Sequence, residues 1–445
     1  MSGNEILGLL MLVAMISIIF VGFPIAFTLL FIALFFGAIG LGAELTFNLA
    51  YLQIWGMMKD DILPAVPLFI FMGFMTEQAG LMERLFLALR NLLAPLRGSL
   101  YLAVILTATI FAMATGIVGA AVTVLGIMAG PVMMRAGYDA KLSAGAIAAG
   151  GTLGILIPPS VMLVVMGPTI GVPVNLLYAA TLGPGLFLAF LYICYCLIRS
   201  HLKPELGPPV PMAERVTDKM ELAREFFIGV VPLTVLIGFT LGTILAGIAT
   251  PTEAAACGAF GATMLAAAYR RLTFKALKNA AMSTMITASM VLFLAVASSV
   301  FGAVFTKLGA TDLIAGGLSQ VPLPDWGKLL LVMGLVFILG WPFEWPAIIL
   351  VFLPIFLPVV QKLDLGLSPQ ELMIWFGALV AVNLQTAFLS PPVAMSAYYL
   401  KNVMPQWSLS TIYRGMGEFM VIQVLCLAAV LLWPEIALWL PRVMQ

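Results

Sequence analysis

The sequence Gly-Gly-Thr-Leu-Gly-Ile-Leu-Ile-Pro-Pro-Ser, residues 150–160, lies inside an otherwise apolar run. Glycine costs backbone entropy in a helix, and proline lacks the amide hydrogen that a helix interior needs. We therefore expect this segment to be unwound at membrane depth. A bilayer tolerates free backbone groups only where protein or a watery cavity surrounds them, so the break is a candidate ion or substrate site.

A second interrupted segment lies downstream at residues 382–392, with the sequence Val-Asn-Leu-Gln-Thr-Ala-Phe-Leu-Ser-Pro-Pro. It also ends in a proline pair and follows an apolar run. Two breaks of the same kind in one chain indicate that one structural unit occurs twice.

Composition places the chain among membrane proteins. Of its 445 residues, 62% are hydrophobic and only 9% are charged, whereas a soluble domain has about 25% charged residues. The net charge of +1 comes from dispersed residues, which excludes a nucleic-acid surface. His201 is the single histidine, and the four cysteines lack zinc or redox spacing. Residues 6–21 read as a first membrane helix and not as a cleaved signal peptide, because no positive charge precedes them.

Landmarks recur at a nearly constant offset along the chain. Pro24 and Pro251 each open an apolar helix and lie 227 residues apart, and the same offset separates Pro131 from Pro358. The two proline pairs are 233 residues apart, the excess being a polar insertion near residues 364–370. This spacing predicts two homologous halves.

Each half reads as about five membrane helices with one re-entrant hairpin and one broken helix. An odd number of spans per half would invert the second half relative to the first. We therefore predict an all-α polytopic membrane protein made of two inverted repeats. The predicted parts are a first repeat at 1–200 with its hairpin at 101–135 and broken helix at 141–171, a cytoplasmic linker at 201–224, and a second repeat at 225–445 with its hairpin at 328–361 and broken helix at 371–400.

The positive-inside rule then sets the orientation. If the N-terminus is outside, most of the 21 Lys and Arg fall in cytoplasmic loops. The ones left outside are Lys59, Lys307, Lys328, Lys362 and Arg442. We therefore predict that both termini are periplasmic.

Three motifs carry a resemblance to a known family. They are residues 150–160, Thr-Pro-Thr-Glu-Ala-Ala-Ala at 250–256, and Thr-Ala-Phe-Leu-Ser-Pro-Pro at 386–392. Together they resemble signatures of the large membrane subunit of tripartite ATP-independent periplasmic (TRAP) transporters, and the resemblance covers essentially the whole chain. One departure concerns the first hairpin tip, which is rich in serine in many relatives but has a single hydroxyl, on Thr115, within 115–119 here.

The resemblance implies an elevator-type transporter in a bacterial inner membrane, and not an enzyme. It implies sodium-driven import of an organic acid such as a C4-dicarboxylate, with sodium as coupling ion and no other cofactor. It also implies a small membrane subunit and a periplasmic substrate-binding protein as partners.

Sodium is a hard cation that prefers oxygen ligands, and an unwound segment frees carbonyl oxygens to supply them. We expect one cation between the first hairpin tip and the first break, and a second at the equivalent place in the other half. Close helix packing is the alternative role of each glycine. The candidates for the first are Thr115, Gly116, Gly119, Gly151, Thr152, Gly154 and Ile157, and those for the second are Pro342, Glu344, Trp345, Asn383, Gln385 and Thr386.

An anionic substrate would be met by the N-termini of half-helices and by hydroxyl or amide donors. The candidates are Thr152, Ser160, Asn383 and Thr386. Ser160 could instead satisfy backbone groups at a helix start. No Lys or Arg is expected at mid-membrane depth, so bound cations would have to neutralise the substrate.

Acidic residues in apolar surroundings have two interpretations each. Glu253 could carry a proton or cation, but it follows Thr250 and Pro251 in a capping-box pattern. Glu344 could ligate a cation or cap the returning half-helix. Glu77, near a helix end, is expected at the membrane interface.

Other functions remain open from the sequence alone. A stand-alone sodium/carboxylate symporter would need no accessory subunits. A membrane-embedded enzyme would need a convergent cluster of His, Asp, Glu or Lys at membrane depth. A passive channel would conduct without sodium.

Overall fold

The computed structural model describes residues 2–116, 118–210, 215–216, 218–391 and 394–444. Regular structure in these ranges is entirely helical. Seven of the described helices are long and apolar enough to cross a membrane, or nine if each of two bent pairs is one span. The prediction of an all-α, multi-pass membrane protein is confirmed. Ile117 and Pro392, which belong to the predicted hairpin tip and second break, lie outside the described residues.

The helices α1 to α10 lie in the N-terminal part of the chain. α6 and α7 are the two legs of the first hairpin, and α8 and α9 meet at a bend of 44° in the first broken helix. The helices are α1 Gly3–Val21, α2 Ile25–Gly40, α3 Ala43–Met58, α4 Ala65–Gln78, α5 Leu81–Leu93, α6 Ser99–Thr115, α7 Val118–Arg135, α8 Ala140–Leu156, α9 Val161–Ile170 and α10 Val174–Leu202.

The elements from η1 to α22 follow, and the predicted second hairpin is interrupted between α16 and α18. Its elements are η1 Pro204–Leu206, α11 Lys219–Gly229, α12 Val231–Leu245, α13 Pro251–Ala268, α14 Phe274–Lys307, α15 Ala310–Gln320, α16 Asp325–Leu339, α17 Trp345–Ala347, the π-helix η3 Ile348–Phe352, α18 Leu353–Val360, α19 Pro369–Leu384, η4 Thr386–Phe388, α20 Met395–Val403, α21 Leu409–Leu432 and α22 Glu435–Met444.

Some boundaries differ from the sequence prediction for a local reason. α14 begins at Phe274, where Thr273 caps it by accepting a hydrogen bond from the Ala276 amide at 3.1 Å. α11 begins inside the predicted linker, where the Asp218 carboxylate accepts from the Met220 amide.

The expectation that the whole of 150–160 is unwound is wrong. α8 stays helical through Gly150, Gly151 and Gly154, and the break begins only at Ile157. A Cβ on Gly151 would lie 2.3 Å from Val122 Cγ2 on α7. Gly150 and Gly151 therefore serve close packing of α8 on its neighbours, and the proline pair interrupts the helix.

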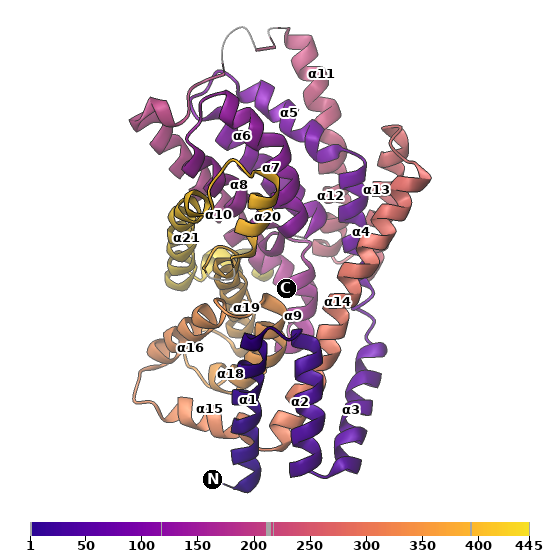
Figure 1. The fold of residues 1–445 in the computed structure, drawn as a ribbon, viewed down its shortest axis with the longest axis vertical. Helices are drawn as coiled ribbons and strands as arrows, with labels where there is room; N and C mark the ends of the chain where they lie inside the picture. The colour runs from indigo at the N-terminus through magenta and orange to yellow at the C-terminus, as the bar shows by residue number, and fades with distance from the viewer. Residues whose placement is uncertain (1, 117, 211–214, 217, 392–393, 445) are drawn as a thin grey trace.

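The two halves are interleaved in space. α14 is a long diagonal rod in Figure 1 and packs against α2, α3 and α4, whereas α4 also packs against α13. α1, α2 and α3 lie at the lower end with the N-terminus, and α5 and α11 lie at the upper end (Figure 1).

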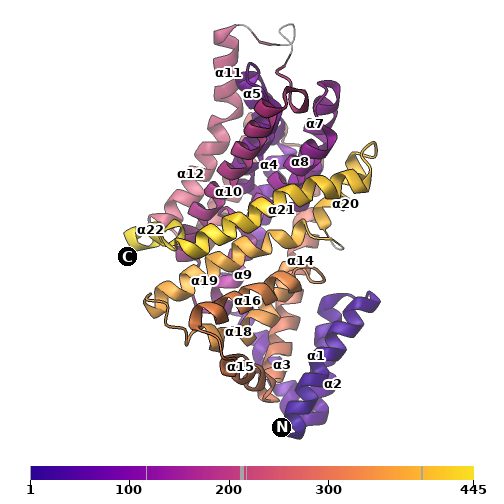
Figure 2. The same ribbon diagram turned by 90° about the vertical axis from the view of Figure 1, so that its left-hand side faces the viewer.

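A block of helices surrounds both broken segments. α21 crosses the molecule beside α19 in Figure 2 and also packs on α8. Three contacts hold the block together. The Trp375 indole donates to the Val430 carbonyl at 2.9 Å, and Glu418 pairs with Lys141 at 2.5 Å and with Arg199 at 3.4 Å. α8, α10, α19 and α21 are thereby joined into one unit.

Candidate functional site

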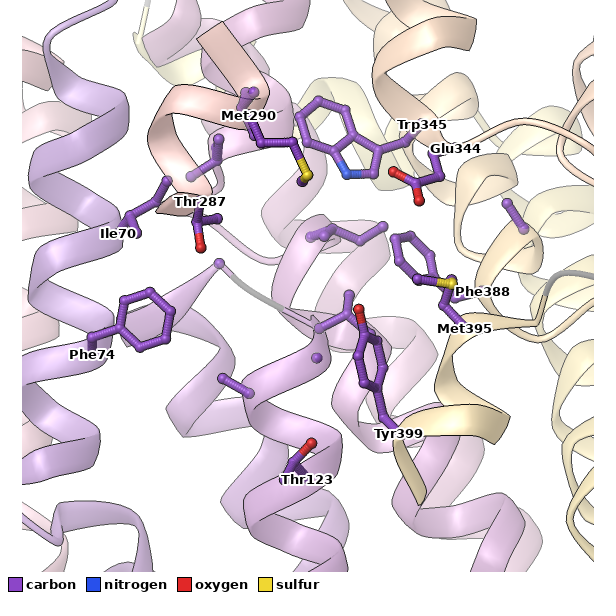
Figure 3. Close-up of a pocket in the computed structure, with 18 of the residues that line it drawn as sticks. Ile70, Phe74, Thr123, Thr287, Met290, Glu344, Trp345, Phe388, Met395 and Tyr399 are labelled. Atoms are coloured by element: carbon purple, nitrogen blue, oxygen red, sulfur yellow. The ribbon is translucent and has the colours of Figure 1, made fainter. Parts of the chain in front are cut away.

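A cavity of about 470 Å³ lies where both hairpin tips and both breaks converge. Two other walls come from α4 and α14 (Figure 3). The lining residues are Ile70, Phe74, Glu77, Gly116, Val118, Gly119, Ala120, Thr123, Ile155, Val161, Thr287, Met290, Val291, Phe343, Glu344, Trp345, Ala387, Phe388, Met395 and Tyr399. The cavity therefore contains surface from both halves of the chain.

The first hairpin tip rests directly on the first break. Gly116 ends α6 with a φ of 59°, a left-handed conformation that favours glycine. A Cβ at this position would lie 3.3 Å from the carbonyl oxygen of Pro159. Next to this contact, α7 begins at Val118 and α9 begins at Val161, and both residues line the cavity.

Backbone oxygens are released at the first break by proline chemistry. Pro158 and Pro159 have no amide hydrogen, so the carbonyls of Gly154 and Ile155 lose the partner four residues on. The Ser160 hydroxyl donates to the Ile155 carbonyl at 2.6 Å. The Thr152 hydroxyl likewise donates to the Ala149 carbonyl at 2.8 Å. A hydroxyl that donates its hydrogen in this way keeps oxygen lone pairs for a cation.

The second break holds buried polar groups of the same kind. The Thr386 hydroxyl donates to the Asn383 carbonyl at 2.7 Å, and the Asn383 side-chain amide donates to the Met333 carbonyl on α16 at 2.8 Å. The Asn383 Oδ1 and both polar atoms of the Gln385 side chain are buried without a hydrogen-bond partner among the described residues. Buried polar atoms are normally paired, so these oxygens have the chemistry that a bound cation needs.

The second hairpin tip presents a carboxylate to the cavity. Glu344 occupies the N-cap position of α17, but its side chain makes no capping hydrogen bond, so the capping interpretation is wrong. Figure 3 shows its carboxylate beside Trp345 and Phe388, above the Tyr399 ring. Within the described chain, no hydrogen bond or ion pair joins Glu344 to another side chain.

The predicted cation-binding residues fall into two groups. The cavity is lined by Gly116, Gly119, Glu344 and Trp345. The buried interior of the breaks holds Gly151, Thr152, Gly154, Ile157, Asn383, Gln385 and Thr386. Pro342 is half-buried at the second tip, and Thr115 ends α6 with a side chain outside the described part.

None of the four predicted substrate-binding residues lies among the described residues that line the cavity. The hydroxyl hydrogens of Thr152, Ser160 and Thr386 are already used by backbone carbonyls, and so is one of the two side-chain amide hydrogens of Asn383. Ser160 satisfies the end of α8 and does not cap α9.

Several lining residues were not foreseen. Phe74 and Glu77 come from α4, Thr287 and Met290 from α14, and Tyr399 from α20. Glu77 was expected at the membrane interface, but it lines the cavity and is half-buried. For Glu77, the one signal in the sequence was an acidic residue within an apolar helix. Phe74, Thr287, Met290 and Tyr399 have no such signal, because they look like ordinary helix residues.

Glu253 is part of a structural cap. Its carboxylate accepts from the Thr250 amide at 2.9 Å, and the Glu253 amide donates to the Thr250 hydroxyl at 3.3 Å. The capping-box prediction is confirmed, and Glu253 is exposed away from the cavity.

The lining of the cavity is acidic. Glu77 and Glu344 are its charged lining residues, and the described lining contains no Lys, Arg or His. In the described part of the chain, no group of three or more His, Cys, Asp or Glu could hold a metal ion.

Two curated relatives align over most of the chain. The C4-dicarboxylate TRAP transporter large permease protein DctM of Pseudomonas aeruginosa is 28% identical, with 88% of each chain covered. The sialic acid TRAP transporter large permease protein SiaM of Vibrio cholerae is also 28% identical, with 96% of each chain covered. Both are named as transporter permeases and not as enzymes.

Among solved structures, the YdaH transporter of Alcanivorax borkumensis has a similar fold. The TM-score is 0.63 over 88% of this chain and 89% of that chain, at 16% sequence identity. Residues 12–436 match the family described as the tripartite ATP-independent periplasmic transporter, DctM component. The family resemblance is thus confirmed, and this multi-pass protein belongs to the TRAP transporters as their large membrane subunit.

Proposed function

We propose that this subunit imports an organic acid across a bacterial inner membrane, driven by sodium. In this proposal, a periplasmic substrate-binding protein delivers the acid, and a small membrane subunit lies beside the chain. The single observation that carries the proposal is the cavity at the meeting point of two hairpin tips and two broken helices. Secondary transporters bind substrate and coupling ions at interruptions of this kind.

Sodium would bind behind the cavity wall. The oxygens freed at Gly154, together with the Thr152 and Ser160 hydroxyls, would hold one ion at the first break. The Asn383 and Gln385 oxygens would hold another at the second break. The acid would occupy the cavity in front of these ions, so that each ligand favours binding of the other.

We further propose that the block of α8, α10, α19 and α21, with both hairpins, moves as an elevator relative to α2, α4, α13 and α14. If the two repeats are inverted relative to each other, the block could open the cavity to one side of the membrane in one state and to the other side in the second state. The contacts within the block, including the Glu418 ion pairs, support motion as one body. α4 and α14 contribute to the cavity from the other side, so sliding of the block along them would carry the cavity across the membrane.

Uptake into proteoliposomes tests the coupling. The complex with its small subunit is reconstituted, the binding protein is added outside, and a panel of radiolabelled organic acids is offered in sodium or in potassium. We expect uptake only in sodium and only with the binding protein. Equal uptake in potassium would exclude sodium coupling, and uptake without the binding protein would favour a stand-alone symporter.

A further inference from the structure

We propose that the cavity accepts an organic acid that also carries a positively charged amino group, so that the cargo is a zwitterion and not a dicarboxylate. This inference rests on the proposed function, because it names the class of acid that the same cavity carries. It follows from the unequal distribution of charge around the cavity wall.

One side of the cavity suits a carboxylate. α7 begins at Val118 and α9 begins at Val161, and both helix starts form part of the wall. The first turn of a helix has amide hydrogens without intrahelical partners and a partial positive charge, which favours an anion. The neighbouring Gly116 also lines this side and adds no side chain between the two helix starts.

The other side suits an ammonium group. The Glu344 carboxylate lies next to the Trp345 indole and the Phe388 ring, and the Tyr399 hydroxyl points toward it (Figure 3). A carboxylate among aromatic rings is the environment in which proteins bind substituted ammonium ions, since each ring face attracts a cation.

Glu77 adds to the acidic character from a third wall. It lies on α4, whereas Glu344 lies on the second hairpin, and basic side chains are missing from the described lining. A dicarboxylate would bring its second negative charge toward Glu344 or Glu77, and the proposed sodium ions alone would have to offset the repulsion, because no basic residue is found in the described lining of the cavity. An amino group at that end of the cargo converts the repulsion into attraction.

Matched acids test the charge at the far end of the cargo. Binding to the purified membrane complex in sodium is measured by calorimetry with ω-amino acids of increasing chain length, with the ω-hydroxy acids and with the dicarboxylates of the same lengths. We expect the best amino acid to bind about tenfold more tightly than its hydroxy and dicarboxylate analogues. A dicarboxylate or hydroxy acid that binds equally well at every length overturns the inference, and so does a series in which no amino acid binds.

Variants locate the ammonium site. Glu344→Gln and Trp345→Leu are each expected to abolish the preference for the amino acid, and Trp345→Phe is expected to keep it because a ring remains. Glu83→Gln is the control, because Glu83 is exposed on α5 outside the cavity. If Glu344→Gln does not fold, the comparison of Trp345→Leu with Trp345→Phe is the test. An equal preference for the amino acid in these two variants contradicts the aromatic site.

Uptake in the same preparations separates this inference from the proposed function. Sodium-dependent uptake of dicarboxylates in preference to amino acids would refute the zwitterion and leave sodium-coupled transport intact. Uptake of amino acids that proceeds equally in potassium would refute sodium coupling and leave the zwitterion inference intact. Sodium-dependent uptake of the amino acids supports both.

Discussion

At the scale of single residues, the candidate site depends on where hydrogen-bond donors are missing. Pro158 and Pro159 remove two amide hydrogens, and the hydroxyls of Thr152 and Ser160 donate to neighbouring carbonyls. The first break consequently holds more oxygen lone pairs than donors to satisfy them. Such an excess favours a cation over an anion in the interior of the break.

Gly116 provides a test of the contact between the first tip and the first break. Gly116→Ala adds left-handed strain of about 1–2 kcal/mol and crowds the Pro159 carbonyl. We expect a lower melting temperature and a loss of uptake. Gly137→Ala is the matched control, because Gly137 also has positive φ but no atoms near its Cβ position. Equal effects of both variants on uptake would mean that the tip contact has no role in transport.

Thr386 tests the second cation site. In Thr386→Ala the hydroxyl oxygen is lost, and we expect the sodium concentration for half-maximal uptake to rise about tenfold, or about 1.4 kcal/mol. Asn383→Ala should act in the same direction. Thr181→Ala is the control, since Thr181 is equally buried but bonds the Leu177 carbonyl within α10. Unchanged sodium activation in the Thr386 and Asn383 variants, at normal protein levels, would remove both residues from the site.

At the scale of elements, helix ends in this chain obey local rules. Capping boxes begin α1, α13 and α19, and each uses a Ser or Thr followed by Glu at the third helical position. These helix starts are readable from the sequence because the interacting groups lie within one turn. The glycines of α8 are not readable in this way, since their role depends on Val122 in another helix.

The cap of α13 allows a prediction about an acid that resembles a transport residue. Glu253→Ala removes both hydrogen bonds of the carboxylate to Thr250, and we expect a small loss of stability, seen as a slightly lower melting temperature in detergent. The sodium dependence of uptake should not change, because Glu253 lies away from the cavity. A shift in sodium activation would show that Glu253 takes part in coupling after all.

At the scale of the whole molecule, the cavity is assembled from residues far apart in the chain. Glu77 and Tyr399 line one space although they belong to opposite halves. The Gly119 position illustrates the contact between halves, because a Cβ there would lie 3.0 Å from the Tyr399 ring. No periodicity within either helix indicates such a contact.

The predicted orientation is also a property of the whole molecule. Arg135 ends α7 and Lys307 ends α14, and both are exposed. In a variant with the four native cysteines replaced by alanine, we expect a membrane-impermeant thiol reagent to label Arg135→Cys only from the cytoplasm. Lys307→Cys should be labelled only from the periplasm. Labelling of both from one side would contradict the positive-inside assignment.

The sequence by itself determined the membrane class, the helical fold and the proline pair that interrupts the chain after α8. These features follow from apolar content, from the missing proline amide and from capping within one turn, all of which are local. Only the tertiary structure decided that Gly150 and Gly151 remain helical and that Glu344 faces the cavity while Asn383 is buried behind it. Those outcomes depend on packing between helices that are distant in the chain, which no local pattern records.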